Sequence, residues 1–354
     1  MKKKQILKIV SKVYPFIFIA IFLTVLIIPL GNLNLNPAVL ESSFFGRLRM
    51  VRAVTDLRIA IGDSLFPNSL IGKKGWLFQT SEKEIENYQH DIPFTKEQLT
   101  ELQQNLDAAA AIFKEQGTTL LIVVAPTKSS IYPDYMPAEL QLIRPQSRFD
   151  QLVQYLKQYG QTQILDLRQE LIANREVQQV YYKTDTHWTS YGAYIAYQEI
   201  LKTLQPVYPS LVPRALSDFK PDSKGLVSMD LAAQIGSARI KEEKIVLNPV
   251  VETKATWHDV RLDDGRWITM SWNPNENLPK AVIYYDSFLY PYIPWFYDHF
   301  SQITAIPHYA NSSIWNLSWV IQEKPDVVIV EIAERYIHDL SVLFNPENIS
   351  IPSK

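Results

Sequence analysis

The chain has 354 residues, 47% hydrophobic, 12% aromatic and 20% charged, a composition that excludes a disordered chain and suffices for a large buried core. Its formal net charge of -2 at pH 7 argues against nucleic acid as a partner, because a nucleic-acid-binding face needs an excess of Lys and Arg. The absence of cysteine excludes disulfides, a thiol nucleophile and thiolate metal sites.

The N-terminal segment has the pattern of an uncleaved membrane anchor. Residues 1–12 include five lysines, and residues 13–30 are uncharged. A helix of that length, rising about 1.5 Å per residue, nearly spans a hydrocarbon core about 30 Å thick. The lysines predict a cytoplasmic N-terminus, with the remaining chain in the periplasm or outside the cell. A cleaved signal peptide is the competing interpretation, but its apolar region would be shorter, and no Ala-x-Ala-like site follows Leu30.

Residues 31–69 are predicted to form a membrane-proximal linker with an amphipathic helix. The segment RLRMVRAVTDLR, residues 47–58, intersperses arginines with apolar residues. It leads into Gly62-Asp63-Ser64-Leu65, which matches the motif around the nucleophilic serine of GDSL-type esterases. The linker therefore contains one candidate nucleophile, Ser64.

Residues 70–345 are predicted to form one α/β domain, followed by a tail at 346–354. Thr95 and Gln98 have the spacing of a capping box at the start of its first long helix. Apolar strands that alternate with helices indicate a mostly parallel sheet covered on both faces, with ligands at the carboxyl ends of the strands. Helices are expected at 95–117, 149–160, 312–324 and from about 190, and strands at 118–126, 163–167, 280–287, 302–306 and 326–333.

Residues 206–280 interrupt this alternation with clusters of Pro, Gly, Asp and Asn. Their shorter alternating stretches predict a β-rich excursion from the core. A separate small domain is the alternative interpretation.

The segment YYKTDTHWTSYGAY, residues 181–194, carries the strongest chemical signal. Asp185 and His187 are two residues apart, so in an extended segment their side chains point the same way, and Ser190 can cap the helix behind them. General-base catalysis requires a carboxylate beside an imidazole, because the acid fixes the tautomer and stabilises the imidazolium. Direct contact between the pair requires a turn at Thr186. The alternative interpretation is a helix-start loop with a capping Asp and a half-buried His.

Metal ligation is a weaker alternative for this pair. The other five histidines show no H-x-x-x-H or comparable spacing. We therefore expect neither a metal ion nor a cofactor. These histidines are His90, His258, His299, His308 and His338.

A base of this kind needs a nucleophile, and Asp-Ser pairs end at Ser64, Ser223 and Ser287. Ser223 lies in the turn-like KPDSKG, with no strand before it. A GDSL-type esterase takes its base from a late D-x-x-H, yet no Asp stands three residues before any of the six histidines, so Ser64 lacks a partner. The buried-type strand AVIYYDS delivers Ser287 to the carboxyl end of the sheet, where its own N–H can help hold an oxyanion. We therefore predict Ser287 as the nucleophile, against the alternative that Asp286-Ser287 is only a strand-end turn.

With these residues identified, the chain resembles the SGNH hydrolase-like domain of alginate O-acetyltransferases of the AlgX/AlgJ type over about residues 70–340. The order and spacing of the matching segments carry the resemblance. They are GKKGWLF (72–78), VVAPTKSSIYPDYMP (123–137), TDTHWTSYGAYIAY (184–197), YDSF (285–288) and KPDVVIVEIAER (324–335).

The resemblance implies a flavodoxin-like three-layer SGNH hydrolase-like fold and a catalytic triad in permuted order. Ser287 would be acetylated, His187 would act as base and acid, and Asp185 would orient the imidazole. The implied activity is acetyl transfer to hydroxyls of an extracytoplasmic polysaccharide, with the acetyl group supplied by a membrane-bound O-acyltransferase. Tyr285 departs from the family pattern, in which Gly or Arg is frequent before the Asp, so the oxyanion geometry is in question.

Three further residues in matching segments, Lys128, Trp188 and Arg335, are expected to serve packing or structural ion pairing. The aromatic segment YPYIPWFYDHF, residues 290–300, is open to two interpretations, a surface that stacks sugar rings or ordinary core. Since only a short segment follows Leu340, with no carbohydrate-binding module in it, the expected acceptor is an exopolysaccharide or cell-wall glycan other than alginate.

Two alternative functions remain at this point. The first is a polysaccharide acetylesterase that uses the same triad and passes the acetyl group to water. The second is a non-catalytic glycan-binding or assembly subunit of an acetylation complex that keeps the fold.

Overall fold

A computed structural model describes residues 16–17, 19–23, 47–237, 239–262, 265, 267–308 and 318–345. The chain divides into two compact units. One comprises residues 1–63 and 236–239, and the other comprises residues 64–235 and 240–354.

In the first unit, the helix expected in the linker is present as α3 (Arg47–Ala60). Three apolar side chains three residues apart, Val51, Val54 and Leu57, are exposed on it. The expected membrane segment at 13–30 falls largely outside the described residues. No helix within the described ranges is both long enough and apolar enough to cross a bilayer.

The second unit is built on a seven-stranded sheet with the order β5-β4-β12-β10-β11-β9-β8. The five strands from β5 to β11 run parallel, and β9 and β8 continue the sheet antiparallel. The mostly parallel α/β sheet expected from the sequence is therefore confirmed. The strands are β4 (Thr119–Ala125), β5 (Ile164–Asp166), β8 (Thr256–Arg261), β9 (Trp267–Trp272), β10 (Lys280–Tyr285), β11 (Gln302–Pro307) and β12 (Val327–Ala333).

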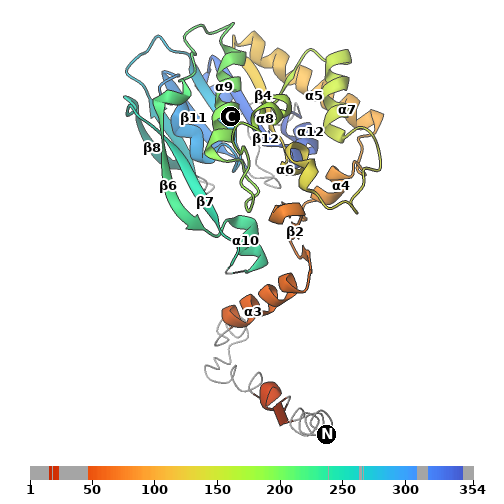
Figure 1. Ribbon diagram of the computed structural model, residues 1–354. Helices are drawn as coiled ribbons and strands as arrows, with labels where there is room; N and C mark the ends of the chain where they lie inside the picture. Colours follow the sequence, from red (N-terminus) through yellow and green to blue (C-terminus); the bar gives the residue numbers. More distant parts are fainter. Residues whose placement is uncertain are drawn as a thin grey trace, which may run out of the picture. The chain divides into compact units, whose positions relative to one another are not determined.

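Helices cover both faces of this sheet (Figure 1). Successive β4 residues alternate between the two cores: Leu121 and Val123 pack with α9, and Ile122 and Val124 pack with α5, α7 and α12. Strands buried on both faces must be apolar at nearly every position, which explains the unbroken apolar runs. The α-helices of this unit are α4 (Glu84–Tyr88), α5 (Lys96–Glu115), α6 (Lys128–Ile131), α7 (Arg148–Tyr159), α8 (Arg168–Asn174), α9 (Ser190–Leu204), α10 (Asp230–Ile235), α11 (Ser318–Glu323) and α12 (Leu340–Leu343).

Helix starts follow the capping chemistry of the sequence, with one correction. Thr95 accepts a hydrogen bond from Gln98 N while the Gln98 side chain accepts one from Thr95 N, so the expected capping box begins α5. At α9, the cap is Thr189, whose side chain accepts from Gly192 N. The expectation that Ser190 caps this helix is wrong, because Ser190 is already its first helical residue.

Residues 206–280 are β-rich as expected, but they do not form one excursion. The strands β6 (Phe219–Val227) and β7 (Glu242–Pro249) form a separate antiparallel hairpin, with α10 between them. In contrast, β8 and β9 join the main sheet, because β9 pairs with β11. The second half of the segment thus extends the core instead of leaving it.

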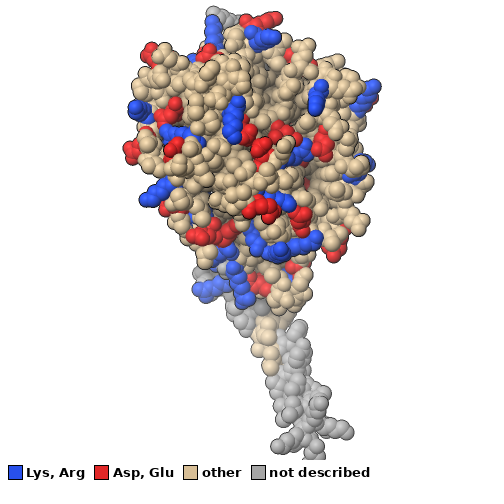
Figure 2. Space-filling view, turned by 45° about the horizontal axis from the view of Figure 1, so that its top comes forward, with Lys and Arg blue, Asp and Glu red and all other residues tan. Residues whose placement is uncertain are grey.

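Short elements complete the second unit. A three-stranded sheet of β1 (Leu65–Phe66), β2 (Ser69–Ile71) and β3 (Leu77–Gln79) precedes α4. Among its described residues, the 3₁₀ segments are η2 (Lys73–Gly75), η3 (Pro133–Tyr135), η4 (Leu216–Asp218), η5 (Tyr290–Phe296) and η6 (Glu334–Asp339). On the face drawn in Figure 2, Lys and Arg lie interspersed with Asp and Glu, in keeping with a net charge near zero.

Gly192 near the start of α9 offers a test of how closely this fold is packed. A Cβ atom there would lie 2.1 Å from Val180 O and 2.9 Å from the Trp188 Cβ atom. Gly192→Ala should therefore displace the start of α9 and lower the free energy of unfolding by about 1–3 kcal/mol. Chemical denaturation measures this, with the exposed Lys202→Ala on the same helix as a control expected within about 0.5 kcal/mol of wild type. Equal effects of the two substitutions would contradict the close approach.

Candidate active site

The loop that carries Asp185 and His187 is closed at its base by backbone pairing. Tyr181 and Trp188 form an antiparallel bridge, and Thr189 N donates to Val180 O at 2.9 Å. Tyr182 N donates to His187 O at 3.2 Å. We call residues 182–187 the D-x-H loop.

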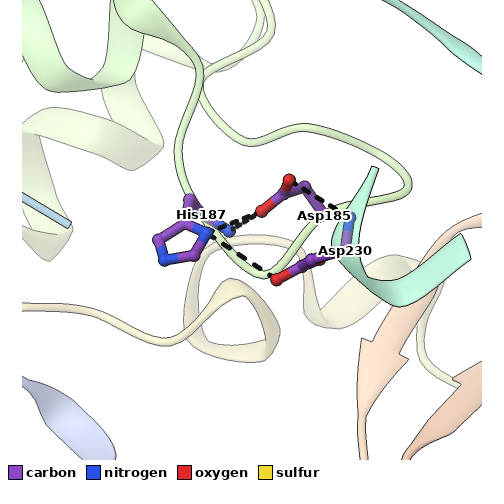
Figure 3. Close-up of side chains that lie close together, drawn as sticks. All are labelled: Asp185, His187 and Asp230. Carbon is purple, nitrogen blue, oxygen red and sulfur yellow. Dashed lines mark hydrogen bonds and ion pairs between the residues drawn. The ribbon is translucent and has the colours of Figure 1, made fainter. Parts of the chain in front are cut away.

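Within the D-x-H loop the backbone bends at residues 185–187, as the contact between the pair requires. Asp185 Oδ1 accepts from His187 N at 2.9 Å and lies 2.7 Å from His187 Nδ1 (Figure 3). The side chains are 15% and 29% exposed, so both are sheltered and the imidazole still reaches solvent. Although burial acts against it, the hydrogen bond and charge of His187 hold the pKa of Asp185 below its ordinary value.

Ser287 completes a chain of hydrogen bonds with this pair. Its Oγ lies 2.9 Å from His187 Nε2, across 100 residues of sequence. The tautomer that satisfies both contacts carries its hydrogen on Nδ1, facing Asp185, and leaves Nε2 to accept from the Ser287 hydroxyl. The structure thus brings together all three residues that the sequence singled out.

A turn after β10 holds Ser287 in place through its neighbour Asp286. Asp286 Oδ1 accepts from Phe288 N and Oδ2 accepts from Ala333 N, each at 2.8 Å. Asp286 N in turn donates to Glu331 Oε2 at 2.9 Å. Glu331 is fully buried in β12, and burial together with the charge of Asp286 raises its pKa well above its ordinary value. The turn that carries Ser287, residues 286–289, is thereby tied to the neighbouring strand β12.

Lys128, the first residue of α6 after β4, holds the D-x-H loop through hydrogen bonds to the loop backbone. The residue is 95% buried, and its ammonium donates to Asp185 O at 2.6 Å, Tyr182 O at 3.2 Å and Lys183 O at 3.3 Å. Burial lowers the pKa of Lys128 to about 8, against the opposing charges of Asp230 and Asp185. Lys128 was expected to serve packing or ion pairing; its hydrogen-bond partners in the structure are backbone carbonyls of the loop.

Trp188 and Arg335 also have structural contacts. Trp188 Nε1 donates to Phe288 O at 2.9 Å and so links the D-x-H loop directly to the turn that carries Ser287. The Arg335 guanidinium pairs with Glu82 at 3.0 Å and lies 5.6 Å from the centre of the Phe288 ring. Both residues position the site through packing and pairing, as expected.

Asp230 is a site residue that sequence reasoning missed. It begins α10, accepts from Thr186 N at 2.8 Å and from the Thr186 hydroxyl, and places Oδ2 3.7 Å from His187 Nδ1 (Figure 3). Burial and the neighbouring Asp185 raise the pKa of Asp230. The imidazole therefore faces two carboxylates. The only local signal was an acidic residue at a helix start, which is common at helix starts generally.

Asp185, His187 and Asp230 are also the residues that could hold a cation. One donor atom from each lies within 4.8 Å of the other two. The 2.7 Å contact between Asp185 and His187 Nδ1 is a hydrogen-bond distance, so a cation bound at this nitrogen would have to replace its proton. The hydrogen-bonded arrangement and metal ligation by Nδ1 therefore exclude each other.

The other candidate serines lie elsewhere. Ser64 precedes β1, and its carbonyl accepts from Ile71 N within the small three-stranded sheet. Ser223 lies on the β6–β7 hairpin, where its hydroxyl donates to Glu243. Neither contacts His187, whose hydroxyl partner through Nε2 is Ser287.

A cleft of about 390 Å³ opens beside Ser287 and His187. This volume lies within the range of small-molecule sites. Tyr292 and Trp295 from the aromatic segment and residues of strand β7 are among those that line it. Tyr292 and Trp295 are more than 90% buried and their ring centres lie 4.7 Å apart, so at these two positions the segment is core that also lines the cleft, whereas Tyr290 is exposed.

Comparison with known proteins finds a family model and curated relatives that this chain resembles. A family model described as "SGNH hydrolase-like domain, acetyltransferase AlgX" matches residues 70–255. The "Probable alginate O-acetylase AlgJ" of Pseudomonas syringae pv. tomato is 28% identical over 170 residues, which are 45% of this chain and 40% of that protein. The chain thus spans about two fifths of the length of this curated relative.

Solved structures agree in fold. Bacillus cereus PatB1 with a sulfonyl adduct has a TM-score of 0.56 at 16% identity, covering 77% of this chain and 96% of that one. A DHHW family protein from Eubacterium siraeum has a TM-score of 0.55 at 17% identity, covering 78% and 96%. At these identities the likeness concerns the fold alone.

The buried carboxyl of Glu331 predicts a pH-dependent stability. Its pKa is raised in the folded chain, so its contribution is fully present below pH 4.5 and is lost as pH rises toward the raised pKa. Glu331→Gln keeps an acceptor for Asp286 N and cannot ionise, so its melting temperature relative to wild type should increase from pH 5 to pH 8. Glu331→Leu removes the acceptor and should cost about 1–3 kcal/mol. Thermal melts at both pH values measure this, and parallel wild-type and Glu331→Gln curves would contradict it.

Proposed function

The chain belongs to the family of SGNH hydrolase-like domains that includes the acetyltransferase AlgX, and from this premise we propose that it is an extracytoplasmic polysaccharide O-acetyltransferase. The observation that carries the proposal is the continuous hydrogen-bond chain Asp185–His187–Ser287, with contacts of 2.7 and 2.9 Å. A serine, a base and an orienting carboxylate in this order are what acyl transfer through a covalent intermediate requires.

The first half-reaction would acetylate Ser287. His187 Nε2 accepts the hydroxyl proton as Oγ attacks the carbonyl carbon of the acetyl donor, and Asp185 stabilises the imidazolium that forms. Collapse of the tetrahedral intermediate breaks the bond to the donor oxygen. The imidazolium returns the proton to that leaving oxygen, so that acetyl-Ser287 and neutral His187 remain.

The second half-reaction reverses these roles on the acceptor. His187 takes the proton of a sugar hydroxyl, whose oxygen attacks the acetyl carbonyl. The bond from the carbonyl carbon to Ser287 Oγ breaks, and the imidazolium returns its proton to Oγ. The products are the O-acetylated sugar and free Ser287.

The Ser287 N–H is a candidate donor for the oxyanion in both steps. No residue in the described part of the chain accepts a hydrogen bond from it. Tyr285, the departure from the family pattern, is 3% exposed and packs in the core beside Tyr290, with ring centres 6.0 Å apart. The Tyr285 side chain is thus accommodated by burial in the core, which is compatible with a functional turn.

We propose a polysaccharide as the acceptor and a membrane-bound O-acyltransferase as the donor partner. The relative from Pseudomonas syringae is named for alginate, a polysaccharide, which supports the class of acceptor. An acetyl donor made in the cytoplasm needs a membrane protein to pass its acetyl group to a domain outside.

An acetylesterase is the second candidate, because the 29% exposure of the His187 side chain gives water access to the base. The two functions differ only in whether water or a sugar hydroxyl accepts the acetyl group from Ser287. Product analysis with an acetyl donor and oligosaccharides separates them: hydrolysis without transfer at any acceptor concentration would rule out the transferase.

Ser287→Ala should abolish acetyl-enzyme formation and lower transfer by at least about 10³-fold, because the covalent intermediate cannot form. Asp185→Asn should lower it by on the order of 10³–10⁴-fold through loss of the correct imidazole tautomer. The measurement is transfer from 4-nitrophenyl acetate, with mass spectrometry of the acetylated peptide. Ser64→Ala is the matched control, expected at wild-type activity. Acetylation at a residue other than Ser287 would sink the proposal.

We further propose that residues 13–30 anchor the chain, with residues 1–12 in the cytoplasm. The support is the lysine-rich start and the uncharged run of 18 residues. The full chain should therefore stay in bacterial membranes during alkaline carbonate extraction, and protease added to spheroplasts should digest the region after residue 64. Deletion of residues 13–30 should release the protein from the membrane. Protection from external protease would contradict the orientation.

A further inference from the structure

The helix α10 is attached to the D-x-H loop through consecutive loop residues. Ala232 N donates to Thr184 O at 3.2 Å, and Asp230 N donates to Asp185 Oδ2 at 3.4 Å. In the other direction, Thr186 N donates to Asp230 Oδ1 at 2.8 Å. Ala232 is also fully buried. Because hydrogen bonds run both from α10 to the loop and from the loop to α10, the Asp230 carboxylate has a fixed position against Thr186.

Thr186 is the residue at which the chain turns between Asp185 and His187. The N–H of His187 donates to the Asp185 side chain. The N–H of Thr186 itself donates to Asp230. Thr186 is 8% exposed, and a buried N–H without an acceptor is unfavourable. Asp230 therefore stabilises the turn that brings Asp185 and the imidazole together.

The Thr186 hydroxyl contacts both Asp230 and the imidazole. It donates to Asp230 Oδ2, and its oxygen lies 3.2 Å from His187 Nδ1. A hydroxyl has one hydrogen, and an ionised carboxylate can only accept. While that hydrogen is donated to Asp230, the Thr186 oxygen can only accept from the ring, so Nδ1 carries a hydrogen of its own. This is the tautomer whose Nε2 accepts the hydrogen bond of Ser287.

An amide in place of the Asp230 carboxylate would reverse this arrangement. Oδ1 accepts from two backbone groups, Thr186 N and Leu231 N. An amide has to keep its oxygen at that position, and its NH₂ group then faces the Thr186 hydroxyl as a donor. The hydroxyl hydrogen has to turn elsewhere, and His187 Nδ1 is within its reach. That bond favours the tautomer with its hydrogen on Nε2, which cannot accept from Ser287.

We propose that Asp230 is a positioning residue for acetyl transfer and that it acts through the Thr186 hydroxyl. It holds the turn of the D-x-H loop and accepts the Thr186 hydrogen, so that His187 keeps its hydrogen on Nδ1. This inference rests on the proposed acetyl transfer at Ser287 and assigns to that reaction a residue outside the triad. The described residues that line the cleft beside Ser287 do not include Thr186 or Asp230, so both are expected to act on the rate and not on binding.

Asp230 also lies close enough to the imidazole for a direct effect of its charge. Its Oδ2 is 3.7 Å from His187 Nδ1 (Figure 3). If this charge alone mattered, its loss would slow the reaction whether or not residue 186 has a hydroxyl. The two explanations therefore differ in the effect of Asp230→Asn after the Thr186 hydroxyl has been removed.

The test is a double-mutant cycle on the full chain in detergent, with 4-nitrophenyl acetate as donor. Its members are wild type, Asp230→Asn, Thr186→Val and the double variant. Stopped-flow release of 4-nitrophenol gives the maximal rate of Ser287 acetylation and the donor concentration that gives half of it. Thermal melts report whether each variant has folded. Asp222→Asn is the matched control, because Asp222 lies on β6 and pairs with Lys224.

Asp230→Asn should lower the maximal rate about tenfold and leave the half-saturating donor concentration unchanged. Thr186→Val alone should stay within about threefold of wild type, and in its presence Asp230→Asn should lower the rate less than about threefold. Asp222→Asn should behave as wild type. If Asp230→Asn does not fold, Asp230→Ser replaces it in the cycle with the same expected coupling, because serine can still cap α10 but its side chain is too short to meet Thr186 as the carboxylate does.

The outcomes separate this inference from the proposed function. If wild type forms no acetyl-Ser287, the proposed transferase function fails. If wild type is acetylated but Asp230→Asn keeps the wild-type rate, or lowers it equally with and without the Thr186 hydroxyl, the inference is overturned and the function stands. A change confined to the half-saturating donor concentration would likewise overturn it, since a positioning residue outside the cleft acts on the rate.

Discussion

The geometry of the site depends on one buried cation. Lys128 is 95% buried and satisfies its ammonium with three backbone carbonyls of the D-x-H loop. A buried ammonium without partners would cost several kcal/mol, so the loop carbonyls have to turn inward to meet it. Lys128 holds Asp185 O, the Asp185 carboxylate accepts a hydrogen bond from the imidazole of His187, and its charge lies close to the Lys128 ammonium.

The second half of the site is anchored independently and then joined to the first. The turn that carries Ser287 is tied to β12 through Asp286, Glu331 and Ala333, so its position follows from the sheet. Trp188, next to His187, donates to the carbonyl of Phe288, next to Ser287. Because this bond is buried at both ends, it fixes the separation of two segments 100 residues apart and leaves His187 and Ser287 at hydrogen-bond distance.

Much of the core was predictable because its signals are local. The capping box at Thr95 and the apolar runs of β4, β10 and β12 each depend on neighbours within a few residues. The predictions that were wrong concern two features: a helix cap for which two neighbouring residues compete, and strands whose place depends on pairing with a distant strand. Thr189 caps α9 instead of Ser190, although either hydroxyl is suitable, because the loop closure places Thr189 at the boundary. The strands β8 and β9 join the main sheet because β9 pairs with the outer edge of β11. The pattern of apolar residues in 256–272 does not indicate which strand they pair with.

The sequence by itself determined the class of fold and the three residues of the proposed triad, because a strand followed by Asp-Ser and a D-x-H before a helix are patterns written in adjacent residues. Only the tertiary structure decided what surrounds them. Asp230 stands 44 residues from Thr186, and β7 lies in a segment with no catalytic motif, yet both come to the D-x-H loop. The β6–β7 hairpin packs against α9, and such contacts between distant segments follow from three-dimensional packing, which the spacing of residues along the chain does not record.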